Sequence, residues 1–333
     1  MKSFEFMRPV DPQAAIATAV LARTAQQGAD VRFVAGGTTL IDLMKLNVET
    51  PARVLDINRL PLDKIESTRD GGLKIGATVR NSDLANHSAV QLDYSVLSQA
   101  ILNGASAQLR NMATTAGNLL QRTRCMYFRD TAMPCNKREP GTGCPAITGT
   151  NRMLAILGTS EHCIASNPSD MCVAMAALEA TIHVMGSKGS RAVPIGDFHL
   201  LPGSTPHRET VLEPGDLITH VTLPPSVAGS KQVYLKLRDR ASYEFAIASA
   251  AVVINVDGQN VTRARIALGG VGTKPWRSHE AEAALVGQAP NAANFRKAAE
   301  VALREAKPQS QNGFKIEMAR RCLAHALQMA TTA

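Results

Sequence analysis

The sequence predicts an α+β protein with more than one domain, for three reasons. Its 333 residues are more than one small domain usually needs, and 45% of them are apolar, which suffices for a core. Up to about residue 225, short strand-like runs alternate with helical ones, and beyond it three strands precede three helical runs. We therefore expect an N-terminal domain over residues 1–225 and a smaller C-terminal α+β domain over residues 226–333.

Short elements follow one another through the N-terminal domain. Asp11 is placed to cap a first helix that ends near Gly28, and Val31–Val34 is a compact apolar strand. Helical periodicity returns over residues 81–100, and another helix is expected over residues 168–180. Further strands are expected at Ser3–Met7, Arg53–Ile57, Leu73–Ala77, Met153–Leu157, Cys163–Ser166, Thr181–Met185, Arg191–Pro194, Val211–Leu212 and Leu217–Leu223.

The C-terminal domain is expected to group its helices behind an antiparallel sheet. Asp257 and Gly258 form a strong hairpin signal between two apolar runs. The expected strands are Gln232–Leu237, Ala246–Val256 and Thr262–Gly269, and the expected helices are Ser278–Leu285, Ala292–Ala306 and Phe314–Ala330.

The turn after the strand at residues 31–34 has the composition of a phosphate-binding loop. Ala35–Leu40 reads Ala-Gly-Gly-Thr-Thr-Leu and leads into a helix. Small residues permit close approach, and a helix N-terminus offers free N–H donors to an anion. Most such turns are purely conformational, so this one alone is weak support. The chain contains neither GxGxxG nor GxxxxGK[ST], which disfavours a nicotinamide Rossmann domain and a P-loop.

A second small-residue turn, Thr114–Asn118, lies in a segment without carboxylates at residues 102–120. Its order is Thr-Thr-Ala-Gly-Asn, which again lets backbone N–H groups approach an anion. Two candidate anion-binding turns in one chain favour a phosphate-bearing cofactor more strongly than either turn does by itself.

Charge and composition restrict the kinds of partner. The formal net charge is +8, but one Trp, four Tyr and eight Phe provide few stacking groups for nucleic acid, so we expect no nucleic-acid partner. Cations concentrate at residues 105–144, where we expect a solvated or partner-facing basic surface that could dock an acidic acceptor such as a ferredoxin. The alternative is that these cations offset the charge of a negatively charged cofactor.

The sequence predicts no membrane span. No apolar run approaches the roughly 20 residues of a spanning helix. The N-terminus also lacks the apolar segment of an export signal. The chain is therefore expected to be soluble and cytoplasmic by its own sequence, although a signal on a partner subunit would carry a folded complex to the periplasm.

Four cysteines lie along a polar loop rich in Pro and Gly at residues 121–163, called the cysteine loop below. Cys125, Cys135, Cys144 and Cys163 contain no CxxC pair, unlike zinc ribbons and ferredoxin-type runs. Such a loop can bury little core of its own, and bound metal would supply the missing folding free energy. From the residues alone, an iron–sulfur cluster, a zinc ion and unligated thiols all stay open.

The other two cysteines are expected to be core residues and not ligands. Cys172 lies on the apolar stripe of the helix at residues 168–180, and Cys322 lies among apolar residues of the last helix. A disulfide framework is disfavoured, because a chain without an export signal meets a reducing compartment.

Six segments then point to a known family. They are, in order, FVAGGTTLIDLMKL, GATVRNSDL, LRNMATTAGNLL, NPSDMCVAMAALEA, LKLRDRASYEFAIASAAV and ALGGVGTKPWR. Over essentially the whole chain, they resemble the flavin-binding medium subunits of molybdenum hydroxylases, the xanthine dehydrogenase and carbon monoxide dehydrogenase family. The loop QRTRCMYFRDTAMPCNKREPGTGCPA is similar to an insertion that carries a [4Fe-4S] cluster in the flavin subunit of bacterial three-subunit aldehyde oxidoreductases.

The resemblance implies a fold and a function. The fold would be a two-subdomain FAD-binding domain of the vanillyl-alcohol-oxidase/PCMH type, at about residues 1–57 and 58–225, followed by a three-stranded antiparallel sheet with a helical bundle. The chain would be an electron-transfer flavoprotein subunit without catalytic residues for substrate. Substrate would react at the molybdenum cofactor of a large partner. Electrons would pass through [2Fe-2S] centres of a small partner to FAD, and then to an external acceptor such as ferredoxin or oxygen.

The resemblance also assigns cofactor contacts position by position. Asp170 matches an aspartate placed on the FAD, with a first-turn helix acid as the alternative. Lys236 matches a lysine near the flavin ring, with a solvated lysine as the alternative. Ala116 stands where the family usually has Gly, so a slightly shifted contact is expected there. The full assignment is Phe33, Val34, Ala35, Gly36, Gly37, Thr38, Thr39, Leu40, Gly104, Ala105, Thr114, Thr115, Ala116, Gly117, Asn118, Asp170 and Lys236 for FAD, and Cys125, Cys135, Cys144 and Cys163 for the cluster.

Two rival functions stay open at this stage. The first is a free-standing flavin oxidase or reductase of the same cofactor-binding fold, for which the sequence provides no assignable acid or base. The second is a zinc-stabilised binding module without redox function.

Overall fold

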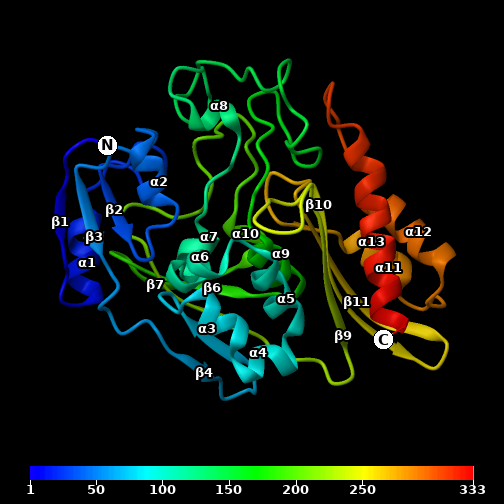
Figure 1. Cartoon of the computed structure of the whole chain (residues 1–333). Coiled ribbons are helices and arrows are strands. Elements are labelled where there is room, and N and C mark those ends of the chain that lie inside the picture. Colours follow the sequence, from blue (N-terminus) through cyan, green and yellow to red (C-terminus); the bar gives the residue numbers. More distant parts are fainter. Residues whose placement is uncertain (333) are drawn as a thin grey trace.

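The chain forms three separate β-sheets, as Figure 1 shows for the computed structural model, which describes residues 1–332. The N-terminal sheet is parallel, in the order β1-β3-β2. Its elements are β1 (Glu5–Met7), α1 (Pro12–Ala19), β2 (Val31–Val34), α2 (Leu40–Lys45) and β3 (Arg53–Asp56). Asp11 caps α1 by accepting a hydrogen bond from the Ala14 N–H at 2.7 Å, as the sequence predicts. The turn at residues 35–39 leaves the carboxyl end of β2 and enters α2 directly.

The second sheet is antiparallel and has the order β4-β5-β8-β6-β7. Its strands are β4 (Ile65–Ser67), β5 (Leu73–Gly76), β6 (Thr181–Gly186), β7 (Gly189–Pro194) and β8 (Leu217–Leu223). The helices of this part are α3 (Asn81–Asn86), α4 (Ser88–Asp93), α5 (Ser95–Asn103), α6 (Ala107–Met112), α7 (Thr115–Leu119), α9 (Asp170–Ala177) and α10 (Ile195–Phe198). All eight residues of α9 are buried, which makes it the central helix of the largest core cluster.

The third sheet is antiparallel and has the order β12-β11-β10-β9. Its strands are β9 (Lys231–Leu237), β10 (Ala248–Asp257), β11 (Asn260–Gly269) and β12 (Trp276–Arg277), and its helices are α11 (His279–Leu285), α12 (Ala292–Ala302) and α13 (Phe314–Thr332). The predicted hairpin at Asp257 and Gly258 joins β10 to β11. The two-residue β12 adds a fourth strand to the three that the sequence predicts. It pairs with β11 only when the chain folds back on itself, so the local sequence does not indicate it.

The continuous apolar run of β10 is explained by burial on both faces. Ala250, Val252 and Ile254 belong to the core cluster formed with α11, α12 and α13, whereas Ala251 and Val253 belong to the cluster of α5 and α9. Alternate strand residues point to opposite faces, so the third sheet is packed between the C-terminal helices and the helices of the N-terminal part. Figure 1 shows α13 along one side of this sheet.

Some predicted elements are wrong. The helical stretch at residues 81–100 is divided among α3, α4 and α5. Met153–Leu157 and Cys163–Ser166 are not strands and form only isolated bridges, as does the region of Val211–Leu212. In the segment 153–157, backbone carbonyl oxygens accept hydrogen bonds from the Lys315 and Asn312 side chains and not from a neighbouring strand. Composition alone could not indicate these partners. The cysteine loop contains one short helix, α8 (Met126–Arg129).

Candidate functional site

The two glycine-bearing turns that the sequence singles out lie against each other. A Cβ atom on Gly36 would be 1.9 Å from the Met112 carbonyl oxygen, just before the second turn. No side chain fits there, so glycine is required by the contact between the turns. Gly37 has φ +72°, a left-handed conformation that also favours glycine.

The backbone donors of the two turns differ. The N–H groups of Gly36, Gly37, Thr38 and Thr39 donate to no acceptor within residues 1–332, so they are available to an anion. In the second turn four of the five N–H groups are already used. Thr115 and Ala116 donate to the carbonyl oxygens of Val79 and Ala77 at 2.9 Å, and Gly117 and Asn118 donate to Thr114. The second turn therefore offers side chains, and not a nest of free N–H groups, to a ligand.

Both turns line cavities. A cavity of about 570 Å³ lies within the range of small-molecule and cofactor sites. It is called the flavin cavity below, after the cofactor that the family resemblance implies. A neighbouring cavity of about 140 Å³ is lined by the first turn, and Thr38, Thr39 and Gly117 line both cavities. Among the remaining predicted residues, those on the wall of the flavin cavity are Gly104, Ala105, Asn118, Asp170 and Lys236.

A buried acid–base pair stands in the wall of the flavin cavity. Lys236 Nζ lies 2.7 Å from Asp170 Oδ2 and 3.0 Å from the Asn103 carbonyl oxygen, and its side chain is 1% exposed. The alternative of a solvated Lys236 is therefore wrong. Asp170 is also the first residue of α9, so the same residue is both an acid in the first turn of a helix and part of the cavity wall.

Tyr234 lies in the core behind this wall, bonded to Asp170, and the sequence did not single it out. Its hydroxyl donates to Asp170 Oδ1 at 2.5 Å and lies 2.9 Å from the Ser249 hydroxyl. Burial, together with the adjacent Asp170 carboxylate, raises the pKa of Tyr234 well above its usual range, so it stays a donor. Tyr234 and Lys236 are two residues apart on β9 and therefore face the same side, which is the signal that could have identified it.

Two residues with strained backbones border the flavin cavity. Ala105 has φ 53° and Tyr243 has φ 55°, and both line it. Non-glycine residues with positive φ cluster at ligand sites, because the surrounding structure holds them there at a cost of about 1–3 kcal/mol each. Ala105 is one of the residues that the family resemblance assigns to FAD.

The structure brings the four predicted cysteine ligands together. Cys125, Cys135, Cys144 and Cys163 line one small cavity of about 10 Å³, and three of them are buried. Burial raises the pKa of Cys125 to about 12 and raises the pKa values of Cys144 and Cys163 as well. Without a metal these thiols keep their protons, and a metal would displace them. Over residues 1–332, no three His, Cys, Asp or Glu side chains are arranged to hold a single metal ion.

The other two cysteines are core residues, as predicted. Cys172 and Cys322 are at most 1% exposed and belong to the two largest apolar clusters. All six cysteines are free thiols.

The expectation of an exposed basic surface at residues 105–144 is wrong. The six cations of this segment are buried or half-buried: Arg110, Arg122, Arg124, Arg129, Lys137 and Arg138. Each finds a partner inside the protein: Arg129 binds Asp42 at 2.8 Å, and Arg138 donates to the carbonyl oxygens of Tyr127 and Phe128. Sequence proximity could not show this for Arg122, Arg129 and Lys137, because their carboxylate partners come from other segments.

Comparison with known proteins decides the family. The family described as the FAD binding domain in molybdopterin dehydrogenase matches residues 2–226, and the CO dehydrogenase flavoprotein C-terminal domain matches residues 232–330. The chain belongs to the flavin-binding subunits of the molybdenum hydroxylases. It is an oxidoreductase subunit, and the resemblance found in the sequence is confirmed.

Individual relatives of this family are similar over almost the whole chain. The aldehyde oxidoreductase FAD-binding subunit PaoB of Escherichia coli (strain K12) is 51% identical over 328 residues, 98% of each chain. The carbon monoxide dehydrogenase medium chain of Hydrogenophaga pseudoflava is 27% identical over 92% of this chain and 91% of its own.

Solved structures confirm the fold class. A reconstituted CO dehydrogenase from Oligotropha carboxidovorans matches with a TM-score of 0.78 and 25% identity, covering 99% of this chain and 98% of that one. Quinoline 2-oxidoreductase from Pseudomonas putida 86 matches with a TM-score of 0.76 at 22% identity, which shows the fold alone. Within residues 1–332, no helix combines the length and apolar character needed to cross a membrane.

Proposed function

We propose that this flavoprotein is the electron-transfer subunit of a molybdenum-containing aldehyde oxidoreductase. Electrons would arrive from [2Fe-2S] centres on a small partner, whose own donor is a molybdenum cofactor on a large partner. They would leave through FAD and a [4Fe-4S] cluster of this chain to an external acceptor. The observation that carries the proposal is the flavin cavity, which is lined by Thr38 and Thr39 of the first turn and by the buried Lys236–Asp170 pair. The first turn presents four unused N–H groups.

The residues present fit FAD. The free N–H groups at Gly36–Thr39 would bind its diphosphate, and the Thr114 and Asn118 side chains would contact it from the second turn. Asp170 and Lys236 would orient the ring, held in place by Tyr234. When bound, FAD supplies the redox chemistry, and the chain supplies position and electrostatics.

The cysteine loop would hold the cluster. Cys125, Cys135, Cys144 and Cys163 line one cavity, and each thiolate of a [4Fe-4S] cluster binds a different iron. The similarity of the loop to a cluster-bearing insertion favours this group over a zinc ion.

A third cavity supports electron transfer between the two cofactors. Its volume is about 200 Å³, and it is lined by Cys125 together with Arg124, Asp170 and Phe245, which also line the flavin cavity. The Arg124 guanidinium lies over the Phe245 ring at 5.1 Å. Cys125 is the one of the four cysteines that lines this cavity. Cys144 is the one ligand of the four that is not fully buried, and it marks the exit toward an acceptor such as ferredoxin or oxygen.

Two further assignments belong to this proposal. The FAD-binding domain would end near residue 225, with subdomains at about 1–57 and 58–225, and the two family matches at residues 2–226 and 232–330 support the main boundary. The complex would be cytoplasmic on the sequence of this chain, or periplasmic if a partner carries the export signal.

The decisive experiment uses the native complex and the isolated chain side by side, without oxygen. An aldehyde should bleach the flavin absorption bands of the complex and leave those of the isolated chain unchanged. Dithionite serves as the control and should bleach both. If an aldehyde bleached the isolated chain, the rival of a free-standing flavin oxidase or reductase would replace this proposal.

A further inference from the structure

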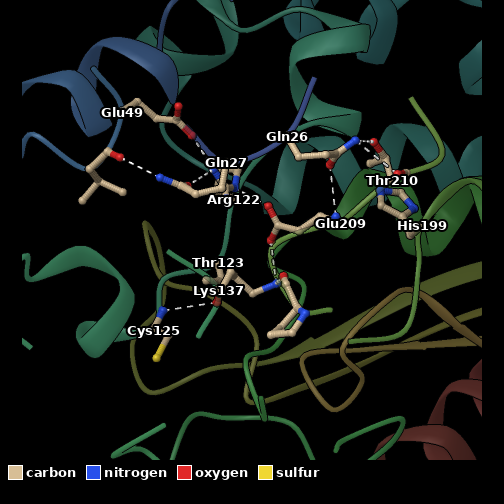
Figure 2. Close-up of polar contacts among 12 residues, drawn as sticks. Gln26, Gln27, Glu49, Arg122, Thr123, Cys125, Lys137, His199, Glu209 and Thr210 are labelled. Carbon is tan, nitrogen blue, oxygen red and sulfur yellow. Dashed lines mark hydrogen bonds and ion pairs between the residues drawn. The ribbon is translucent and has the colours of Figure 1, made fainter. Parts of the chain in front are cut away.

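A chain of five alternating charges runs through the interior between the cysteine loop and the first turn. Lys137 pairs with Glu209 at 2.9 Å, Glu209 pairs with Arg122, Arg122 pairs with Glu49, and Glu49 pairs with Arg32 at 2.9 Å. No side chain of the five is more than 24% exposed. Figure 2 shows the Glu209 carboxylate between the Arg122 and Lys137 side chains.

The five charges come from separate parts of the chain. Arg32 lies on β2, three residues before the first turn, and Arg122 and Lys137 lie in the cysteine loop. Buried charges are stabilising only when paired, and removing one partner of a buried pair typically costs about 3–5 kcal/mol. Alternation satisfies each charge and leaves one net positive charge, because both ends of the series, Lys137 and Arg32, are cations.

Lys137 lines the small cavity that Cys125, Cys135, Cys144 and Cys163 surround, called the cysteine cavity below. It lines that cavity with all four cysteines, and it lines a second cavity with Cys163. The backbone places it there, because Lys137 follows Cys135 by two residues and the intervening Asn136 donates to the His162 carbonyl oxygen at 3.1 Å. The ammonium is fixed by the Pro206 carbonyl oxygen at 2.9 Å and by Glu209.

We propose that Lys137 is a positioning residue that raises the reduction potential of the cluster, and that Glu209 sets how strongly it does so. This inference rests on the proposed [4Fe-4S] cluster at Cys125, Cys135, Cys144 and Cys163. In the step concerned, one electron would pass from the flavin to the cluster, and Lys137 would form and break no bond. The reduced cluster carries one more negative charge, which a nearby fixed cation stabilises in a site of low dielectric constant.

The two residues must act with opposite sign. Loss of the Lys137 charge removes stabilisation of the reduced cluster, so the potential falls. Loss of the negative charge of Glu209 leaves the positive charge of Lys137 less neutralised, so the reduction potential of the cluster rises. A purely structural ion pair would not produce opposite shifts, because breaking it from either side disturbs the same contact.

The test is a potentiometric titration of the native complex, with the EPR signal of the reduced cluster as the readout. In Lys137→Met, the ratio of reduced to oxidised cluster at a fixed potential should fall about tenfold, a shift of about 59 mV for one electron. Glu209→Gln should raise the ratio, and Lys137→Arg should stay close to the unmodified protein. Lys74→Met is the matched control, because Lys74 pairs with Glu66 at 3.1 Å on the exposed surface, and its potential should not change.

The remaining outcomes distinguish a failure of this inference from a failure of the proposed cluster on which it rests. An unmodified protein without iron would overturn the proposed cluster itself. Intact clusters whose potentials move in the same direction in Lys137→Met and Glu209→Gln, or do not move, would overturn the inference alone. Loss of iron in both variants would also overturn it, since the pair would then be structural.

Discussion

The flavin cavity and the cysteine loop are stabilised in different ways. The two turns of the cavity are attached to β2, α2 and α7, whose backbone hydrogen bonds form without a cofactor. The cysteine loop has only α8, and three of the ten buried residues of its core cluster are cysteines. FAD would therefore leave a folded site, whereas loss of the proposed [4Fe-4S] cluster would remove the centre of the core of the loop.

The largest effect is expected from breaking the cysteine loop. Cys135→Ser should lose nearly all cluster iron and make residues 121–163 roughly tenfold more sensitive to protease, because the loop has little other core. FAD content should change little, since the turns of the flavin cavity stay paired. Iron analysis and limited proteolysis measure the two effects.

The matched control for this variant is a buried cysteine outside the loop. Cys322→Ala removes a thiol that is 1% exposed in α13 and should leave the iron content unchanged. Equal iron in Cys135→Ser and the unmodified protein would show that the ligand set is wrong.

The next effect tests the contact between the two turns. Gly36→Ala places a methyl group 1.9 Å from the Met112 carbonyl oxygen, so the turns must separate. Overpacking of this kind costs about 1–3 kcal/mol, which would weaken FAD binding roughly 5–150-fold if the strain falls on the bound state. Fluorescence titration of the FAD-free protein measures the affinity.

A glycine with open space around it provides the control. Gly196→Ala meets no atom within 4 Å and has no left-handed backbone, so FAD affinity should stay the same. An unchanged affinity in Gly36→Ala, with iron also unchanged, would contradict the role of the first turn.

The two regions also differ in how their stability depends on pH. Burial lowers the pKa of His199 from 6.5 to about 4, and its Nε2–H donates to the Leu119 carbonyl oxygen at the end of α7. Because the unfolded chain binds this proton more readily, stability is lost as pH falls from 6.5 to 4, by about 3 kcal/mol in total.

Glu209 responds in a lower range. Burial alone would raise its pKa, but Arg122 and Lys137 hold the pKa of Glu209 at about 2, below the usual 4.5. Its contribution is therefore present above pH 4.5 and lost as pH falls toward 2. Urea unfolding should show that the free energy of unfolding declines as the pH falls from 6.5 to 4.5. This decline should be less steep in His199→Gln. An equal slope in the two proteins would assign the decline to other groups, and the exposed His279→Gln should not alter it.

The sequence predicts the first turn well and the second only in part. The Gly-Gly pattern after β2 identifies the free N–H groups, because their availability follows from local conformation. The Thr114–Asn118 turn has a similar composition, yet its donors are used by Val79 and Ala77 on a distant segment. Composition could not distinguish these cases.

The sequence also does not indicate whether charged side chains point to solvent or into the protein. The basic cluster at residues 105–144 reads as a surface, but Lys137 and Arg122 turn inward to Glu209 and Glu49, which lie about 70 residues away on either side of them. Burial of Lys236 likewise depends on Asp170, a residue from another domain of the fold. Pairing across such separations is settled by tertiary packing.

The central claim is that one chain holds both a dinucleotide flavin and an iron–sulfur cluster. Cofactor analysis of the purified native protein, with its visible absorption spectrum, tests this most directly. The account predicts one FAD per chain and the iron of one [4Fe-4S] cluster, seen as flavin bands on a broad shoulder that Cys135→Ser removes. Zinc in place of iron, or a spectrum without flavin bands, would contradict it.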